Sequence, residues 1–179
     1  MYEVELKAWV SDVEPVRRTL ERSCTFQRRF DKRDRYFTAP EGAPPQQFRL
    51  RRDGEHLVCT YKQKAVTEGV ETNLEREFEV SDEEAFVGLV ERIGCTALVN
   101  KHKQGSLYRY HGLNVELSYV EGLGTFLEIE KLVADDDAER ARADREVREA
   151  LSRLGGEALH IEARPYTQLL LDTGHGAGE

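Results

Sequence analysis

The sequence contains little cysteine, and no cysteine lies in a recognisable motif. Its 179 residues include Cys24, Cys59 and Cys95, an odd number at wide spacing. There is no CxxC pair and no neighbouring histidine, so the pattern indicates neither a disulfide framework nor a zinc site. We expect ordinary buried thiols at these positions.

Several functional classes are also unsupported. No apolar run approaches the roughly 18–20 residues of a membrane span, and the first residues lack the apolar region of a signal peptide. The formal charge is −8, from 34 acidic and 26 basic residues, which disfavours a nucleic-acid binder. No GxSxG, Walker A or GxGxxG motif occurs. We therefore expect a cytoplasmic, single-domain protein over residues 1–173, with a frayed tail at 174–179.

The pattern of apolar residues predicts an antiparallel α+β domain in which strands predominate. Period-2 alternation predicts strands at 3–10, 26–30, 47–52, 56–64, 74–80, 107–119 (a hairpin around His111) and 125–133. Helices are expected after Asp12, from a capping box at 81–84 to Gly94 with Phe86, Leu89, Val90 and Ile93 on its apolar face, and from about 136 to 154. Residues 164–171 are expected to form a last strand or turn.

Charged residues alternate with apolar ones in these strands, and like charges share a face. Residues i and i+2 of a strand point the same way. The resulting groups are Glu3, Glu5 and Lys7; Arg49 and Arg51; Thr60, Lys62 and Lys64; Glu75, Glu77 and Glu79; Lys101 and Lys103; Glu116 and Ser118; and Glu128 and Glu130. A sheet with one solvated face gives such alternation routinely. Clustering of like charge on one face favours charged faces that line an interior, because a solvated sheet would mix signs.

The chemistry of these faces fits a phosphate ligand with a divalent cation. Rows of Arg and Lys hold phosphate oxygens, and paired carboxylates hold hard cations that bridge phosphates. Carboxylates roughly 7 Å apart along a strand reach one ion only with long side chains. All eight acidic residues on these faces are Glu, although the chain has ten Asp.

An ordered set of motifs resembles the CYTH superfamily, the triphosphate tunnel metalloenzymes. Residues 2–7 (YEVELK) look like its ExExK signature, and the segment 121–130 (EGLGTFLEIE) is the most specific match. The other matching segments are 34–37 (DRYF), 49–51 (RLR), 60–62 (TYK), 76–79 (REFE) and 164–170 (RPYTQLL). Within the superfamily the sequence looks most like the class IV adenylate cyclase branch.

The resemblance implies an eight-stranded antiparallel β-barrel with flanking helices, forming a tunnel that binds triphosphate with Mg²⁺ or Mn²⁺. It implies metal-side carboxylates at Glu3, Glu5, Glu128 and Glu130, and phosphate-binding groups at Lys7, Arg49, Arg51, Lys62, Lys101 and Lys103. Glu77 and Glu79 would orient the basic groups or join a metal site, so that they and Lys7 are the catalytic candidates.

Two positions depart from the family pattern. The family usually has a KxR pair where this chain has Lys101, His102 and Lys103. An Asp that commonly precedes the GLG turn is replaced by Ser118, so a metal-side carboxylate is missing unless Glu116 substitutes. His102 lies between two lysines and is expected to face outward, because adjacent strand residues point to opposite faces.

Three functions remain open from the sequence. The first is an adenylate cyclase, in which the ribose 3′-hydroxyl of ATP attacks the α-phosphate and pyrophosphate leaves. The second is a triphosphatase that hydrolyses inorganic triphosphate or an organic one such as thiamine triphosphate. The third is a non-catalytic nucleotide or polyphosphate sensor, which the four metal-side Glu disfavour and Ser118 favours. The resemblance of the chain ends and of the GLG segment favours the cyclase. We expect a monomer or homodimer that binds neither nucleic acid nor membrane.

Overall fold

The computed structural model describes residues 2–44, 46–67, 70–134, 136–156 and 159–174, with the backbone alone for 62–67 and 70–73. The strands are β1 (Tyr2–Val10), β2 (Thr25–Thr38), β3 (Gln47–Asp53), β4 (His56–Thr67), β5 (Val70–Glu79), β6 (Thr96–Tyr110), β7 (Leu113–Val120), β8 (Gly124–Val133) and β9 (Leu159–Ile161). The helices are α1 (Val13–Ser23), α2 (Glu83–Arg92), α3 (Asp137–Gly155) and α4 (Tyr166–Asp172). None of the described helices is long and apolar enough to cross a membrane.

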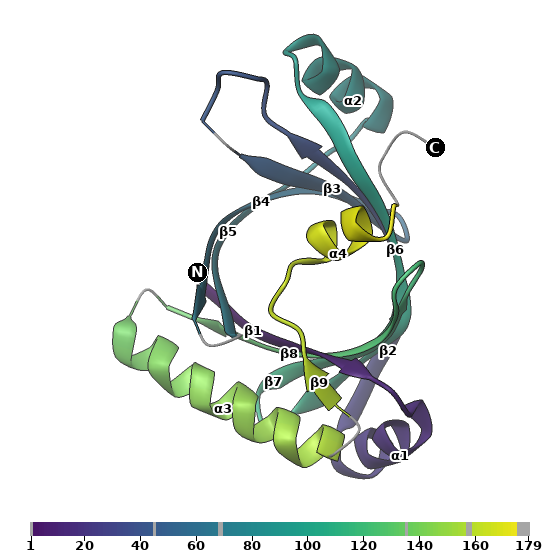
Figure 1. Ribbon diagram of the computed structural model, residues 1–179, viewed down its shortest axis with the longest axis vertical. Helices are drawn as coiled ribbons and strands as arrows, with labels where there is room; N and C mark the ends of the chain where they lie inside the picture. Colours follow the sequence, from purple (N-terminus) through teal and green to yellow (C-terminus); the bar gives the residue numbers. More distant parts are fainter. Residues whose placement is uncertain (1, 45, 68–69, 135, 157–158, 175–179) are drawn as a thin grey trace.

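Strands β1 to β8 form a closed antiparallel barrel, which confirms the expected fold. The strand order is β5-β4-β3-β2-β6-β7-β8-β1, and pairing of β1 with β5 closes the ring. The barrel is viewed along its opening in Figure 1. Because the neighbours run antiparallel, facing residues of adjacent strands share the inner or the outer surface.

Strand β1 makes the transition between the closed wall and the C-terminal segment. Residues Tyr2–Glu5 pair with β5, whereas Ala8–Val10 pair with β9 on the same side. The chain continues from β9 into α4, which lies over the barrel opening in Figure 1. Residues of β1 and of the segment at α4 therefore both line the cavity.

The apolar cores lie outside the barrel wall. Val4, Leu6 and Ala8 of β1 are fully buried in a cluster with apolar side chains of α1 and α3. A second cluster, which includes Leu50 and Cys59, packs under α2. With the apolar faces covered by helices, the charged faces of the same strands are left to line the interior, as the alternation predicted.

The helices begin close to where their caps predicted. Asp12, Asp82 and Asp136 are the N-caps, and each side chain accepts a hydrogen bond from a backbone N–H in the first turn. In α2 the cap is Asp82, one residue after the start of the predicted capping box. Leu89 and Ile93 of α2 are 57% and 59% exposed, so only part of the predicted apolar face is buried.

Three predictions of secondary structure were wrong. Strand β2 extends to Thr38 and β6 begins at Thr96, well beyond the predicted 26–30 and before the predicted 107. The parts of β2 and β6 that were not predicted carry charged or polar residues on both faces: Lys32 and Lys101 point inward, and Arg33 and His102 are more exposed. These parts therefore lack the alternation of apolar and polar residues that predicts a strand. Residues 166–172 form helix α4, not a strand or turn.

Candidate functional site

The barrel encloses a charged cavity of about 800 Å³. Most of the candidate site residues line it, and they come from strands β1, β3 and β5 to β8: Glu3, Glu5, Lys7, Arg49, Arg51, Glu77, Lys101, Lys103, Glu116, Glu128 and Glu130. The side chain of Lys62 lies outside the described residues. Glu79 does not line the cavity: it is the last residue of β5, where the chain leaves the barrel, and its side chain is exposed.

Arg51 and Lys101 are held by a carboxylate that the sequence analysis did not identify as functional, Asp34 of β2. The guanidinium of Arg51 donates from Nε to Oδ1 over 2.7 Å and from Nη2 to Oδ2 over 2.8 Å. The ammonium of Lys101 lies 2.9 Å from Oδ2. Burial alone would raise the pKa of Asp34, but the charges of Arg51 and Lys101 hold it well below its ordinary value.

Arg49 has its own support on the wall of the cavity. Its Nη2 donates to Thr60 Oγ1 over 3.2 Å, and the Thr60 hydroxyl donates in turn to Glu77 Oε1 over 2.8 Å. Glu77 therefore orients a basic group, one of the two roles that the resemblance implied. The Nε of Arg49 is buried and has no hydrogen-bond partner among the described residues, which leaves a buried donor to be satisfied by a ligand.

Two lysines and two glutamates form an alternating network deeper in the barrel. Glu116 accepts from Lys32 over 2.5 Å and from Lys103 over 2.6 Å, and Lys103 also lies 2.5 Å from Glu128. Burial would raise the pKa of Glu116, but Lys103 and Lys32 lower it well below the ordinary value. Both glutamates were expected on the metal side; in this structure both hold lysines.

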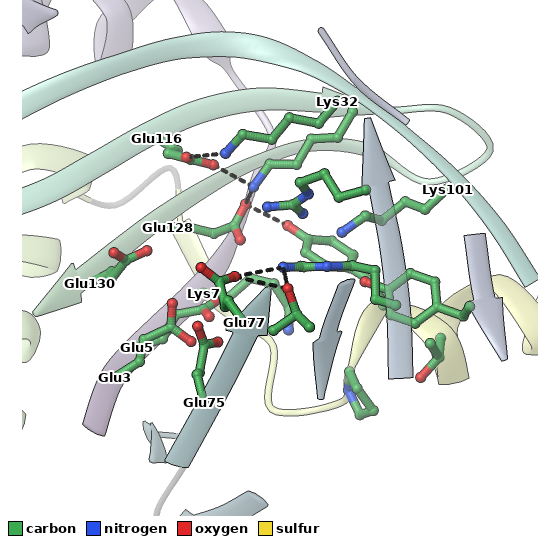
Figure 2. Close-up of a pocket in the computed structure, with 18 of the residues that line it drawn as sticks. Glu3, Glu5, Lys7, Lys32, Glu75, Glu77, Lys101, Glu116, Glu128 and Glu130 are labelled. Carbon is green, nitrogen blue, oxygen red and sulfur yellow. Dashed lines mark hydrogen bonds and ion pairs between the residues drawn. The ribbon is translucent and has the colours of Figure 1, made fainter. Parts of the chain in front are cut away.

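The other carboxylates gather on the opposite side of the cavity. Figure 2 shows Glu3, Glu5, Glu75 and Glu130 close together, away from Lys32 and Lys101. Burial and the charge of Glu3 raise the pKa of Glu130 to about 7, although Asn114 donates to its Oε1 over 2.8 Å. Negative charge is therefore concentrated here at a cost in free energy.

This acidic side has the donor chemistry of a site for a hard divalent cation, because glutamate oxygens are the ligands that Mg²⁺ and Mn²⁺ prefer. Across the described residues, no three His, Cys, Asp or Glu side chains already converge closely enough to hold an ion. A cation would have to draw Glu3, Glu5 and Glu130 together. The raised pKa of Glu130 indicates that positive charge would be favourable there.

The C-terminal segment contributes Tyr166 to the cavity. Its phenol donates to Glu128 Oε1 over 2.8 Å. The ring centroid lies 4.8 Å from the Nζ of Lys7 and 4.6 Å from that of Lys101. The Lys7 ammonium also donates to the carbonyl of Arg164 over 2.8 Å, so residues far apart in the sequence hold Lys7 in place.

Three cavity or supporting residues were missed as functional positions: Lys32, Asp34 and Tyr166. Lys32 and Asp34 share the inner face of β2 at i, i+2 spacing, the same signal that marked the other rows. They were missed because the strand was predicted to end at residue 30. His102 does face outward as expected, where its ring nitrogens contact Asp31 and Glu121.

The departure at Ser118 has a local consequence. Ser118 is buried and its Oγ lies 3.4 Å from Glu128 Oε1. A carboxylate at this position would stand beside Glu128 and Glu116, whereas the hydroxyl adds no charge to the lysine–glutamate network. Lys103, which replaces the usual arginine, is enclosed by that network.

Comparison with known proteins places the chain in a family. Residues 1–166 match the CYTH domain. A protein of Methanocaldococcus jannaschii, provisionally named an adenylate cyclase, is 25% identical over 173 residues, which cover 94% of this chain and 98% of the relative.

Solved structures with the same fold were also found. A protein of Pyrococcus horikoshii has a TM-score of 0.82 and 29% identity, covering 95% of this chain and 98% of its own. A Hippeastrum protein, described as a provisional adenylyl cyclase with a dominant triphosphatase activity, has a TM-score of 0.66 at 17% identity and covers 96% of each chain. The barrel, the charged cavity and the match over residues 1–166 together show that this chain belongs to the CYTH family.

Proposed function

We propose that this protein is a metal-dependent enzyme that cleaves a triphosphate substrate inside the barrel, with ATP cyclisation as the favoured reaction. The observation that carries the proposal is the buried Nε of Arg49, which lacks a partner among the described residues in a cavity that also presents Arg51 and Lys101. Burying a donor without an acceptor is costly, so these residues are suited to binding an anionic ligand.

The basic side of the cavity would hold the phosphate chain. Arg49 and Arg51 present planar guanidinium groups, which suit bidentate contact with phosphate oxygens, and Lys101 adds a compact positive charge. Lys62, whose side chain is outside the described residues, is proposed as a further phosphate ligand. These groups would neutralise the charge that develops on the leaving phosphates.

The acidic side would hold Mg²⁺ or Mn²⁺ through Glu3, Glu5 and Glu130. When bound, such an ion would supply Lewis-acid stabilisation to the negative charge of the phosphates. Glu116 and Glu128 are proposed to orient Lys32 and Lys103 instead, because both carboxylates already contact lysine. Lys7 follows Glu5 on the same face of β1 and opposite Glu128 of β8, so it is proposed as a catalytic group between the metal and the phosphates.

Cyclisation requires the ribose 3′-oxygen to stand in line with the α-phosphorus. The 3′-hydroxyl loses its proton to a base or to solvent and its oxygen bonds to the α-phosphorus. The bond from the α-phosphorus to the oxygen that bridges the α- and β-phosphates breaks, and pyrophosphate leaves. This reaction is supported by the name of the M. jannaschii relative, which covers nearly the whole chain, and by the resemblance of the chain ends to the class IV branch.

A triphosphatase is the second candidate, and a feature of the cavity favours it. Charged side chains suited to phosphate or metal outnumber the aromatic and amide groups, such as Phe48 and Gln47, that could contact a base. In this reaction water attacks the terminal phosphorus and orthophosphate is released. Glu77, which accepts from Thr60 and lies 3.9 Å from Arg49, is proposed to accept the proton in such a step.

Product analysis tests the proposal. The protein is incubated with ATP, and separately with inorganic triphosphate, in the presence of Mn²⁺, and products are resolved by chromatography. Cyclic AMP with pyrophosphate supports the cyclase; ADP or orthophosphate without cyclic nucleotide supports the triphosphatase. Binding of either substrate without formation of any product would support the non-catalytic sensor instead.

A pair of arginine variants tests the phosphate site independently of turnover. Arg49→Ala should weaken triphosphate binding by about 1.5–3 kcal/mol, the scale of a hydrogen bond to a charged group. Arg52→Ala is the control, because Arg52 is on the outer face of β3 and pairs with Glu83. Equal affinities in calorimetry would mean that the cavity does not bind the phosphates.

A further inference from the structure

Asp34 occupies the centre of the basic side without lining the cavity itself. Its side chain has no exposed surface. In the sheet it stands directly between the two cations that it holds, opposite Arg51 on β3 and opposite Lys101 on β6. Arg49, two residues before Arg51, lies 4.0 Å from its Oδ2. One carboxylate therefore stands behind three of the cations that face the cavity.

The contact with Arg51 fixes the plane of the guanidinium. Nε and Nη2 donate to the two oxygens of the same carboxylate, which is the bidentate arrangement. This leaves the N–H groups on the far edge of the guanidinium to a ligand. Because Asp34 lies behind Arg51 and Lys101, a ligand in the cavity would meet those two groups and not Asp34.

Charge alone does not explain this arrangement. A site that only attracted anions would gain from leaving Arg49, Arg51 and Lys101 without a carboxylate. Asp34 cancels part of that charge, but it prevents neighbouring cations from separating and spares the reorganisation that binding would otherwise require. The site therefore loses some attraction for anions and gains a fixed orientation of its cations.

We propose that Asp34 is a specificity-determining positioning residue: by holding Arg51 and Lys101 in fixed orientation, it makes the cavity select a phosphate chain by shape and not by charge. The inference rests on the proposed function, since it presupposes a triphosphate ligand. It assigns Asp34 no contact with that ligand.

The test is the ratio of two affinities measured by calorimetry, for inorganic triphosphate and for sulfate, which has tetrahedral oxygens but no chain. Asp34→Asn should lower this ratio about tenfold, the loss of one well-oriented charged hydrogen bond. The ratio does not depend on the fraction of protein that is folded, so a purely structural defect would leave it unchanged. Asp31→Asn is the matched control, on the exposed face of the same strand.

Asp34→Glu is the second variant in case Asp34→Asn does not fold. It keeps the charge but moves the carboxylate by one methylene, so it should also lower the ratio, by a smaller factor. An unchanged ratio in the variants that fold would overturn the inference while leaving the proposed function intact. Failure of the unmodified protein to bind triphosphate would instead overturn the proposed function.

Discussion

At the scale of single residues, glutamates in different parts of this cavity have pKa values shifted in opposite directions. Lys32 and Lys103 lower the pKa of Glu116, whereas burial and Glu3 raise that of Glu130. The difference comes from the neighbours that the barrel places beside each carboxylate. Glutamates beside lysine are already compensated, and those beside other glutamates are suited to a cation.

The state of Glu130 has a consequence for stability in metal-free protein. Its pKa is about 7 in the folded state against an ordinary 4.5, so protonation favours the fold. This contribution is complete below about pH 4.5 and is lost as the pH rises through 7. We expect Glu130→Gln to gain little over the unmodified protein at pH 5 and to be more stable at pH 8 by roughly 1–3 kcal/mol, since one pKa unit corresponds to about 1.4 kcal/mol.

Urea unfolding in excess chelator at the two pH values measures this difference. Glu55→Gln, at an exposed turn, is the control and should show no pH-dependent gain. A stability difference between Glu130→Gln and the unmodified protein that stays constant from pH 5 to pH 8 would contradict the electrostatic account.

At the scale of elements, the contact between β6 and β7 depends on Gly105. A Cβ at this position would lie 2.4 Å from the carbonyl oxygen of Leu117 and 2.8 Å from the Cα of Ser118. Both atoms belong to the backbone of the paired strand, so they cannot move aside as a side chain would. This close approach positions Ser118 and Glu116, which lies two residues earlier on β7, near Lys103 of β6.

We expect Gly105→Ala to destabilise the protein by about 1–3 kcal/mol, because over-packing against backbone forces strands apart. Gly88→Ala in α2 is the matched control: its Cβ would meet nothing within 4 Å, and alanine is favoured over glycine in a helix by up to about 1 kcal/mol. Thermal denaturation of both variants checks the expectation, and similar melting temperatures would refute it.

At the scale of the whole molecule, the closed barrel separates a basic side from an acidic side across one cavity. Such a cavity should bind a cation and an anion together better than either alone. The bound cation reduces the repulsion between the acidic side and the anion, and the bound anion reduces the repulsion between the basic side and the cation. Under the proposed function, metal and phosphate binding would therefore be coupled through charge, without a movement of the barrel strands.

Metal binding should stabilise the fold as a whole. A ligand at 100 times its dissociation constant adds about 2.7 kcal/mol to the free energy of unfolding, so Mn²⁺ should raise the melting temperature of the unmodified protein. Glu3→Gln should lose most of this increase, and Glu79→Gln, on the exposed end of β5, should keep it. An equal increase in both variants would place the metal elsewhere.

The alternation of charged and apolar residues along each strand was enough to predict which strand faces are charged. The i, i+2 alternation in β1, β3, β5, β7 and β8 indicated an interior lined by Glu, Arg and Lys, and the ordered motifs indicated the family. Periodicity is a local property of one strand, so it can be recognised without knowing which strands lie beside it.

The pairing of those charges depends on which strands lie side by side in the barrel. Whether Glu116 contacts lysine or another glutamate depends on the strand beside it, as does the position of Asp34 between Arg51 and Lys101. Strand order and register bring Asp34 into contact with Arg51, 17 positions later in the chain, and with Lys101, 67 positions later. A pattern within one strand carries no information on which strand lies next to it, and therefore none on which carboxylates are compensated.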